Sequence, residues 1–470
     1  MSKRLGWLLG VVVLMAIGLL VACGSNYQAS SDGLLLVGSQ GSGLIETFSF
    51  SLGTGSIAAV SNTPQDTSNE VCVLGGLPSS LVMDPAGAYA YAIVDGSACG
   101  NNGSAIFAFK VNSDGTTTVV GKQLVEFNPE NVLVQGTTTP VVPPVPVVPS
   151  VMVMDPSGKF LFVADRATTT PPPTPPNTQP VLYVPGAVSV FAIGSGGIVT
   201  EVAGSPFFTS TSPSTLAQSG LDIVSVAPTP TVFPPILING VQNSVCSNPA
   251  LTHPTLEYLY AVDGLGNQVF EFVVNTTTGV LTNPGNGNSM PSFATDQTPA
   301  GVAVDPCNRF VYVSDSLSEK VSAYAICNGS VTSPIVPCSP PAPPGALAEV
   351  KGSPFVLSGS VNGAGPIVVD PYGNYVYVLG TLSNTISPLK ISPISGSLVA
   401  LSPPTVPTGV GPKSMVIRAD DSWMFVSNFG STTVGGNTVT QYAITPATGA
   451  IFAESTPIQT DNYPWGVAVK

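Results

Sequence analysis

One pattern recurs along this chain of 470 residues and constrains its fold more than any other feature. A short apolar stretch is followed by Asp-Pro-x-Gly or a variant of it, by an aromatic-rich strand, and by Ser or Ala with Asp or Asn. The clearest copies are residues 151–165, 301–315, 366–380 and 414–428, and more divergent copies are 81–95 and 222–263. Such a period indicates that each copy is one structural unit packed against its neighbours.

A second element follows each copy: an alternating strand, a turn with Gly, and another strand. Strict alternation of apolar and polar residues is typical of half-buried strands, and Gly between two such strands predicts a hairpin. Seven turns of this kind occur, at Gly55, Gly115, Gly197, Gly279, Gly329, Gly396 and Gly449.

The two ends of the chain complement each other. Residues 34–39 match the second strand of the repeat, whereas residues 465–470 match its first strand and then stop. We therefore predict an all-β fold over 34–470: a seven-bladed β-propeller with four-stranded antiparallel blades, the first blade closed by the C-terminal strand. Two stacked β-domains are the alternative, and they leave the complementary ends unexplained.

The composition agrees with this fold and excludes other classes. Only 8% of residues are charged and 43% are hydrophobic, which excludes a disordered chain. The 49 Gly and 47 Pro residues fit many short strands and turns better than helices. With 13 basic residues and a net charge of −13, the chain lacks the basic surface of a nucleic-acid-binding protein.

The N-terminus has the pattern of an export signal. Lys3 and Arg4 precede an uncharged apolar run, which ends in Leu-Val-Ala-Cys at Cys23. This ending resembles the bacterial lipobox, in which the Cys thiol receives a diacylglyceryl group and the preceding peptide is removed. We expect a signal peptide over 1–22 and a lipidated tether over 23–33; an uncleaved anchor or a plain signal peptide are the alternatives.

The lipid anchor also predicts where the protein resides. Several acyl chains give stable membrane attachment, and Gly24 after the Cys resembles the signal for the outer membrane. We therefore expect an exported lipoprotein at the outer membrane or cell surface. Its expected partners are the membrane, through the anchor, and an envelope protein or a small molecule, with a monomeric propeller and no nucleic acid.

Six cysteines remain besides Cys23, an even number that suggests disulfides in an exported chain. The strand order of a propeller brings certain loops to the same face. It predicts the pairs Cys72–Cys99, Cys246–Cys307 and Cys327–Cys338.

Several stretches resemble one known family. The sequences VYVSD (311–315), VYVLG (376–380) and FVSN (425–428), together with GSPF at 204–207 and 352–355, are similar to the YVTN-repeat and lactonase-like seven-bladed propellers. The resemblance covers 34–470 and implies the fold. The 6-phosphogluconolactonase activity known in that family is an expectation with little support, because few arginines remain to bind a phosphate.

Two sets of acidic residues recur with the repeat. Asp84, Asp155, Asp305 and Asp370 each precede Pro, which predicts turns. A second set follows the second strand of each copy and should reach the face that carries ligand sites in propellers. These residues are candidates for binding a ligand or a Ca²⁺-type cation through oxygen atoms: Asp95, Asp165, Asp263, Asp315 and Asn428.

No other cofactor is predicted. The sequence also offers too few residues of the right kind for a catalytic triad. The one histidine, His253, lies in a Cys- and Pro-rich insertion without a GxSxG motif or metal-ligand spacing. We therefore assign no catalytic residue. The first interpretation is a lipid-anchored binding or assembly scaffold at the cell envelope. The alternative is a lactonase-like hydrolase of small neutral lactones.

Overall fold

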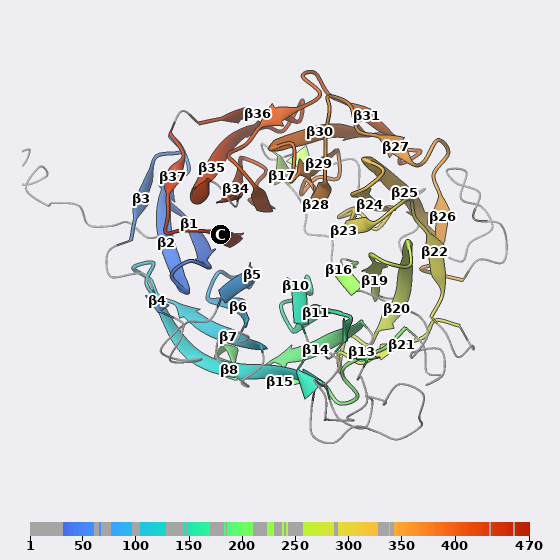
Figure 1. The fold of residues 1–470 in the computed structure, drawn as a ribbon, viewed down its shortest axis with the longest axis horizontal. Coiled ribbons are helices and arrows are strands. Elements are labelled where there is room, and N and C mark those ends of the chain that lie inside the picture. The colour runs from blue at the N-terminus through green and yellow to red at the C-terminus, as the bar shows by residue number, and fades with distance from the viewer. Residues whose placement is uncertain are drawn as a thin grey trace, which may run out of the picture.

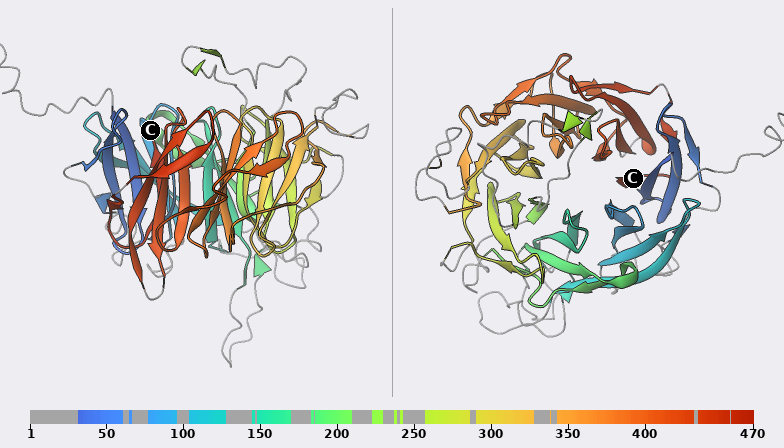
Figure 2. Two further views of the ribbon diagram at one scale, coloured as in Figure 1. Left: turned by 90° about the horizontal axis from the view of Figure 1, so that it is seen from above. Right: turned by 180° about the vertical axis from the view of Figure 1, so that it is seen from behind.

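A ring of seven antiparallel sheets surrounds a central axis in the computed structural model (Figure 1). The structure describes residues 32–60, 65–66, 77–95, 104–127, 145–146, 148–169, 183–184, 186–209, 223–229, 237–238, 241–242, 257–285, 290–327, 338, 343–431, 434–454 and 456–470. Each sheet is a blade, with its first strand next to the axis and its last strand on the circumference (Figure 2). This arrangement confirms the predicted seven-bladed propeller.

The two inner strands of each blade are antiparallel neighbours. In the order of blades 1 to 7, the innermost strands are β38 (Pro464–Val469), β5 (Leu77–Met83), β10 (Val148–Met154), β16 (Ile223–Pro228), β23 (Pro299–Val304), β28 (Ala364–Val369) and β33 (Pro412–Ile417). The second strands are β1 (Asp32–Ser39), β6 (Tyr89–Asp95), β11 (Phe160–Arg166), β19 (Glu257–Asp263), β24 (Phe310–Asp315), β29 (Tyr375–Gly380) and β34 (Trp423–Gly430).

The third and fourth strands form the outer half of each blade. The third strands are β2 (Leu44–Ser51), β7 (Ser104–Val111), β14 (Ala187–Ile193), β20 (Gln268–Val274), β25 (Lys320–Ile326), β30 (Thr385–Ile391) and β35 (Gly435–Thr445). The fourth strands of blades 2 and 3 are β8 (Thr117–Phe127) and β15 (Val199–Glu201). In the other blades the fourth strand is split into two pieces, a division that the repeat pattern does not predict: β3 (Ile57–Ala59) and β4 (Gln65–Asp66), β21 (Leu281–Thr282) and β22 (Ser292–Ala294), β26 (Leu347–Glu349) and β27 (Phe355–Val356), β31 (Leu398–Ala400) and β32 (Val406–Pro407), β36 (Ala450–Ala453) and β37 (Ile458–Gln459).

Smaller elements extend from this ring. They are β9 (Val145–Pro146), which pairs with β8, the hairpins β12 (Thr168–Thr169) with β13 (Tyr183–Val184) and β17 (Leu237–Ile238) with β18 (Val241–Gln242), and the 3₁₀ turn η3 (Ser195–Gly197). Within the described part of the chain, no helix has the length and apolar character needed to cross a membrane.

The C-terminal strand closes the ring, as predicted. Strand β38 pairs with β1 so that Leu35 lies opposite Val469 and Leu36 opposite Ala468. Blade 1 therefore combines the last strand of the chain with its first strands. Because β1 begins at Asp32, the last two residues of the expected tether over 23–33 belong to the sheet.

Apolar side chains fill the spaces between blades. Seven clusters of buried residues are described, and each draws on two neighbouring blades. The second strands β19, β24 and β29 are buried at every position. A strand that is covered on both faces has a nearly continuous apolar sequence, which explains stretches such as YVYVL.

The Asp-Pro turns have the structural role that their sequence predicts. In blade 3 the Asp155 carboxylate accepts hydrogen bonds from the backbone N–H groups of Lys159 and Phe160, both at 2.6 Å. In blade 6 Asp370 accepts from Asn374 and Tyr375 in the same way, at 2.6 and 2.8 Å. These carboxylates hold the turn between the first and second strands.

Of the predicted disulfides, Cys327–Cys338 is present, with Cα atoms 5.8 Å apart. Cys307 is also disulfide-bonded, but its predicted partner Cys246 lies outside the described residues, as do Cys23, Cys72, Cys99 and His253. The predicted turn at Gly329 lies outside them too. In blade 5 the hairpin glycine beside the preceding blade is Gly345.

Candidate functional site

The predicted ligand residues stand at one end of the propeller, each in a different blade. We call this end, which carries the loops between second and third strands, the upper face. From blade 2 to blade 7 they lie at or near the ends of the second strands, in the order Asp95, Asp165, Asp263, Asp315 and Asn428. The fold places them at equivalent heights around the ring but does not gather them into one cluster.

Two of these carboxyls are bonded to the neighbouring strand of their own blade. The Ser189 hydroxyl donates to Asp165 Oδ2 at 2.6 Å, and the Ser322 hydroxyl donates to Asp315 Oδ2 at 2.7 Å. Burial raises the pKa of Asp165 to about 8 and that of Asp315 to about 7. The other oxygen of each carboxyl has no hydrogen-bond partner among the described residues.

Asp263 and Asn428 are held in a similar way. Asp263 accepts hydrogen bonds from the Leu265 N–H and from Gln268 Nε2, at 3.1 and 3.2 Å. Asn428 Nδ2 donates to the hydroxyl of Thr440 at 2.9 Å. Within the described ranges, no group of three His, Cys, Asp or Glu residues is arranged to hold a metal ion. Binding of a ligand or of Ca²⁺ by this set stays a prediction.

A different set of residues stands out on the upper face, at the start of the innermost strands. There the pairing register shifts between Pro149 and Val151, between Pro299 and Gly301, and between Pro412 and Ser414. Each shift is a β-bulge, which takes the residue after Pro out of the ladder and re-aims its side chain. Most blades carry a small residue at this position. Blade 7 carries Lys413, and neighbouring blade 1 carries Trp465.

These two side chains join two aromatic residues, Phe429 near the end of β34 and Tyr463 in the loop before β38. The Phe429 ring lies 5.2 Å from the Trp465 ring in an edge-to-face arrangement and 5.1 Å from the Tyr463 ring. Lys413 Nζ lies 4.9 Å from the centre of the Trp465 ring and 5.6 Å from that of Phe429. We call Lys413, Phe429, Tyr463 and Trp465 the axial aromatic cluster.

The loop before β38 orients Tyr463. This residue has a φ of 60°, in the left-handed region, and the residues at the same place in blades 5, 6 and 7 are Thr298, Gly363 and Gly411, with φ of 55°, 66° and 61°. The Tyr463 N–H donates to Gly436 O in blade 7, whereas its carbonyl accepts from Gln40 N–H in blade 1. The loop therefore bridges the two blades. A residue other than glycine in the left-handed region is strained, and such strain is common at functional sites.

The loop that carries Tyr463 is held by a carboxyl group of blade 1. Glu46 Oε2 accepts hydrogen bonds from the Ser39 hydroxyl at 2.8 Å and from the Asp461 N–H at 2.9 Å. Burial raises the pKa of Glu46, and the charge of Asp461 adds to this effect. The cluster thus combines aromatic faces with one ammonium group, and the loop beside it carries Asp461, whose N–H is bonded to Glu46. The sequence carries a signal for it: when the repeats are aligned at the residue after Pro, Lys413 and Trp465 stand where three other copies have Ser or Ala.

Comparisons with known proteins agree with the resemblance seen in the repeats. The family described as lactonase, 7-bladed β-propeller, matches residues 250–335. No curated protein matches the sequence.

Solved structures match nearly the whole chain. A supposed 6-phosphogluconolactonase of Bacteroides fragilis has 18% identity and a TM-score of 0.60, covering 95% of this chain and 100% of the other. The periplasmic gluconolactonase of Pseudomonas aeruginosa has 17% identity and a TM-score of 0.60, covering 93% and 99%. A protein from Lactobacillus plantarum has 12% identity and a TM-score of 0.61, covering 93% and 99%. At these identities the likeness establishes the shared fold.

Proposed function

We propose that this protein is a lactonase-like hydrolase that opens small neutral lactones at the axial aromatic cluster. The observation that carries the proposal is the position of Lys413 over the rings of Phe429 and Trp465, where two innermost strands begin. The family match over 250–335 supports it. So does the shared fold with proteins named as gluconolactonases.

Each part of the cluster has a role in this reaction. The apolar face of a lactone ring packs on the aromatic rings and is removed from water there. The Lys413 ammonium stabilises the negative charge that develops on the carbonyl oxygen when water attacks. We assign the base that takes a proton from that water to Asp461, two residues before Tyr463 in the chain. The ring C–O bond then breaks, its oxygen takes up a proton, and the product is a hydroxy acid. With one cation in the cluster, we expect neutral lactones to be preferred over phosphorylated ones.

Hydrolysis of a lactone panel at constant pH, with and without Ca²⁺, tests the proposal. We expect Lys413→Met to lower kcat/KM about 100-fold. Trp465→Ala should raise KM about tenfold, because it removes a packing surface used equally by substrate and transition state. Lys390→Met, on the exposed part of β30, is the matched control and should retain full turnover.

Two outcomes would contradict this assignment. Turnover that is lost in Asp165→Asn and Asp315→Asn but retained in Lys413→Met would move the site to the acidic set. If no lactone is turned over, the hydrolase assignment is wrong and the scaffold interpretation is favoured. At present no observation among the described residues supports a scaffold role over a hydrolase.

The cellular location of the protein is the subject of a separate proposal. We infer from the lipobox-like sequence at Cys23 that the propeller is attached to the membrane through acyl chains. Metabolic labelling with a tritiated fatty acid tests it: the wild-type protein should be labelled, and Cys23→Ala should be neither labelled nor retained in the membrane fraction.

A further inference from the structure

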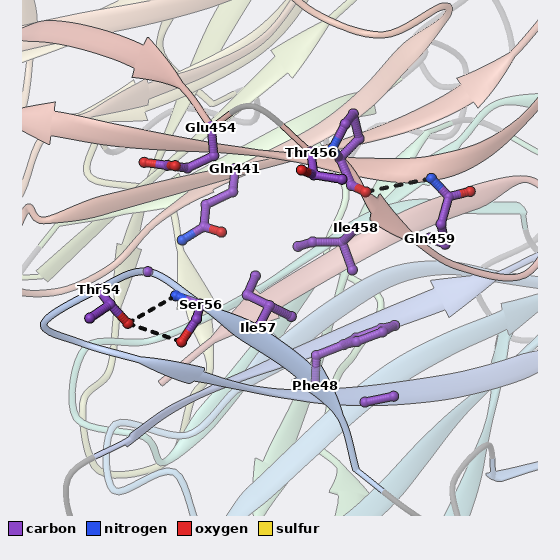
Figure 3. A pocket seen from close by; sticks show the side chains of 12 residues that line it. Phe48, Thr54, Ser56, Ile57, Gln441, Glu454, Thr456, Ile458 and Gln459 are labelled. Atoms are coloured by element: carbon purple, nitrogen blue, oxygen red, sulfur yellow. Dashed lines mark hydrogen bonds between the residues drawn. The ribbon is translucent and has the colours of Figure 1, made fainter.

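A pocket of about 460 Å³ lies in the outer part of the seam where blades 7 and 1 meet (Figure 3). The blade 1 side comes from β2, β3 and their hairpin, and the blade 7 side from β35, β37 and the segment before β37. Its volume is in the range of small-molecule sites. It is formed by residues outside the axial aromatic cluster, so the inference does not rest on the proposed function.

The seam with the pocket lacks a tyrosine hydrogen bond that three other seams have. In blades 4, 5 and 6 a second-strand tyrosine donates to the carbonyl of a hairpin glycine in the next blade. The three pairs are Tyr260–Gly345 at 2.7 Å, Tyr312–Gly396 at 3.1 Å and Tyr377–Gly449 at 3.0 Å. In blade 7 the equivalent residue is Phe425, so this seam lacks the phenol hydroxyl, as it is also absent at Leu36 in blade 1 and Phe162 in blade 3.

A second phenol hydroxyl is missing from the same seam. In blade 7 the third-strand residue Tyr442 donates to Pro407 O of the preceding blade at 2.7 Å, and Tyr324 in blade 5 bonds to Ala294 O in the same way. In blade 1 the equivalent residue is Phe48, and blades 2, 3 and 4 also have phenylalanine at this position. Both Phe48 and Gln459 line the pocket. The pocket thus lies where a third-strand tyrosine hydroxyl is present in two other seams.

The seam also buries polar groups that lack partners. Gln441 lines the pocket and is 4% exposed, and its Nε2 has no hydrogen-bond partner among the described residues. The Trp423 ring packs against Gly55 of the pocket, and its Nε1 is likewise unpartnered there. A buried donor without an acceptor costs free energy. The amide ends of Gln441 are interchangeable, so this side chain can offer a ligand either a donor or an acceptor.

The remaining lining defines the chemistry of the occupant. The hydroxyls of Thr54, Ser56 and Thr456 and the carboxylate of Glu454 lie around it, with apolar walls such as Ile57 (Figure 3). The described lining has no Lys, Arg or His. An anion is therefore disfavoured, whereas a ring that carries hydroxyls and an apolar face fits both kinds of wall. We propose that this seam binds a neutral polyhydroxylated ring of monosaccharide size, whose hydroxyls pair with the Gln441 amide and occupy the place that a tyrosine hydroxyl has in two other seams.

Such a ligand would bridge the blades that close the ring. Because it contacts blade 7 and blade 1 together, it binds the closed ring better than an open one and stabilises it by mass action.

Equilibrium dialysis of the full chain against labelled D-glucose and myo-inositol tests the proposal, with D-glucuronate as an anionic comparison. We expect saturable binding of at least one neutral ring, a rise in Tm with it, and weaker binding of glucuronate. Phe48→Tyr should raise Tm without ligand and weaken binding about tenfold, because its hydroxyl takes the place of a ligand hydroxyl.

Two threonines at equivalent hairpin positions give a matched pair. Thr54→Val removes a lining hydroxyl and should weaken binding, whereas Thr448→Val, in the blade 7 hairpin, should not. Trp465→Ala should leave this binding intact, which separates it from the axial aromatic cluster. The proposal is overturned if no neutral ring binds, if glucuronate binds as well as glucose, or if Phe48→Tyr and Thr54→Val bind like the wild type.

Discussion

At the scale of single residues, the hairpin glycines of the repeat are fixed by the neighbouring blade as well as by their own turn. Gly449 has a φ of 69°, and a Cβ added there would lie 2.3 Å from the Tyr375 ring of blade 6. Gly396 stands in the same relation to Phe310, and Gly279 to Phe160. The sequence predicts a turn at these positions. The sequence does not show why only glycine fits there, because the aromatic ring that excludes a Cβ comes from a residue about 70 to 120 positions earlier in the chain.

We therefore expect Gly449→Ala to lower the free energy of unfolding by about 2 kcal/mol or more, because it combines left-handed strain with a clash. Gly53→Ala is the control, since its added Cβ meets no atom within 4 Å, and we expect a change within about 0.5 kcal/mol. Urea titrations of both variants measure the difference. Equal losses would show that the neighbouring ring plays no part.

A buried carboxyl on the lower face gives a pH-dependent prediction. Asp421 is fully buried, at the place that Gly373 occupies in blade 6, and neither carboxyl oxygen has a partner among the described residues. Burial, with smaller effects from Asp370 and Asp420, raises its pKa to about 8. The folded state therefore holds the proton that the unfolded state releases near its ordinary pKa. The free energy of unfolding is therefore highest below the ordinary pKa of an aspartate, and it falls as the pH rises from there towards 8.

Replacing Asp421 by glycine, the residue found at the same place in blade 6, should remove this dependence of stability on pH. We expect Asp421→Gly to be more stable than the wild type at pH 9, on the order of 2 kcal/mol, with a smaller gain at pH 5. Asp114 is the control: it is exposed, and hydrogen bonds from Thr116 lower its pKa, so Asp114→Asn should leave the difference between pH 5 and pH 9 unchanged. A parallel shift of Asp421→Gly at both pH values would refute the titration.

At the scale of elements, neighbouring blades are joined by tyrosines of the second strands. Tyr312 on β24 donates to Gly396 O of blade 6 across the seam. Tyr91 on β6 is its counterpart in blade 2, and its hydroxyl has no partner among the described residues. The same residue type at the same repeat position therefore differs in its contribution to the seam.

This contrast predicts unequal effects of one substitution. Tyr312→Phe should cost about 1 kcal/mol of stability, because the Gly396 carbonyl loses a donor. Tyr91→Phe should be neutral or slightly stabilising, because it removes an unpaired hydroxyl. Denaturant unfolding of the two variants side by side checks the prediction, and a larger loss in Tyr91→Phe would contradict it.

Much at this scale was predicted from the sequence. The strands, most of the hairpins and the Cys327–Cys338 disulfide follow from local patterns. The split of the fourth strands was not predicted, because each piece is only two to four residues long, too short to show a period. The bulges that present Lys413 and Trp465 were also missed, since they follow from the pairing of two strands and have no signal in one.

At the scale of the whole molecule, seven residues at the C-terminus complete the ring. Strand β38 supplies the innermost strand of blade 1, and the backbone N–H of Lys470 donates to Leu34 O. Without it, β1 becomes an exposed edge and the apolar cluster between blades 7 and 1 loses Val467.

Deletion of residues 464–470 should therefore abolish the cooperative thermal transition and cause association through the open edge. Circular dichroism and size-exclusion chromatography follow the two effects. The matched control is Lys470→Ala, which keeps the backbone pairing and should retain a sharp transition. A truncated chain that melts like the wild type would show that ring closure is dispensable.

The repeat pattern is enough to predict the number of blades, the order of strands, the closure by the C-terminal strand and the turns held by Asp. These depend on local periodicity and on short-range backbone hydrogen bonds. Three features are visible only in the folded chain: Lys413 and Trp465 lie together, Asp165 and Asp315 are each bonded within their own blade, and one seam holds a pocket. The physical reason is that contacts between blades join residues far apart in the chain, and strand register sets which of them meet.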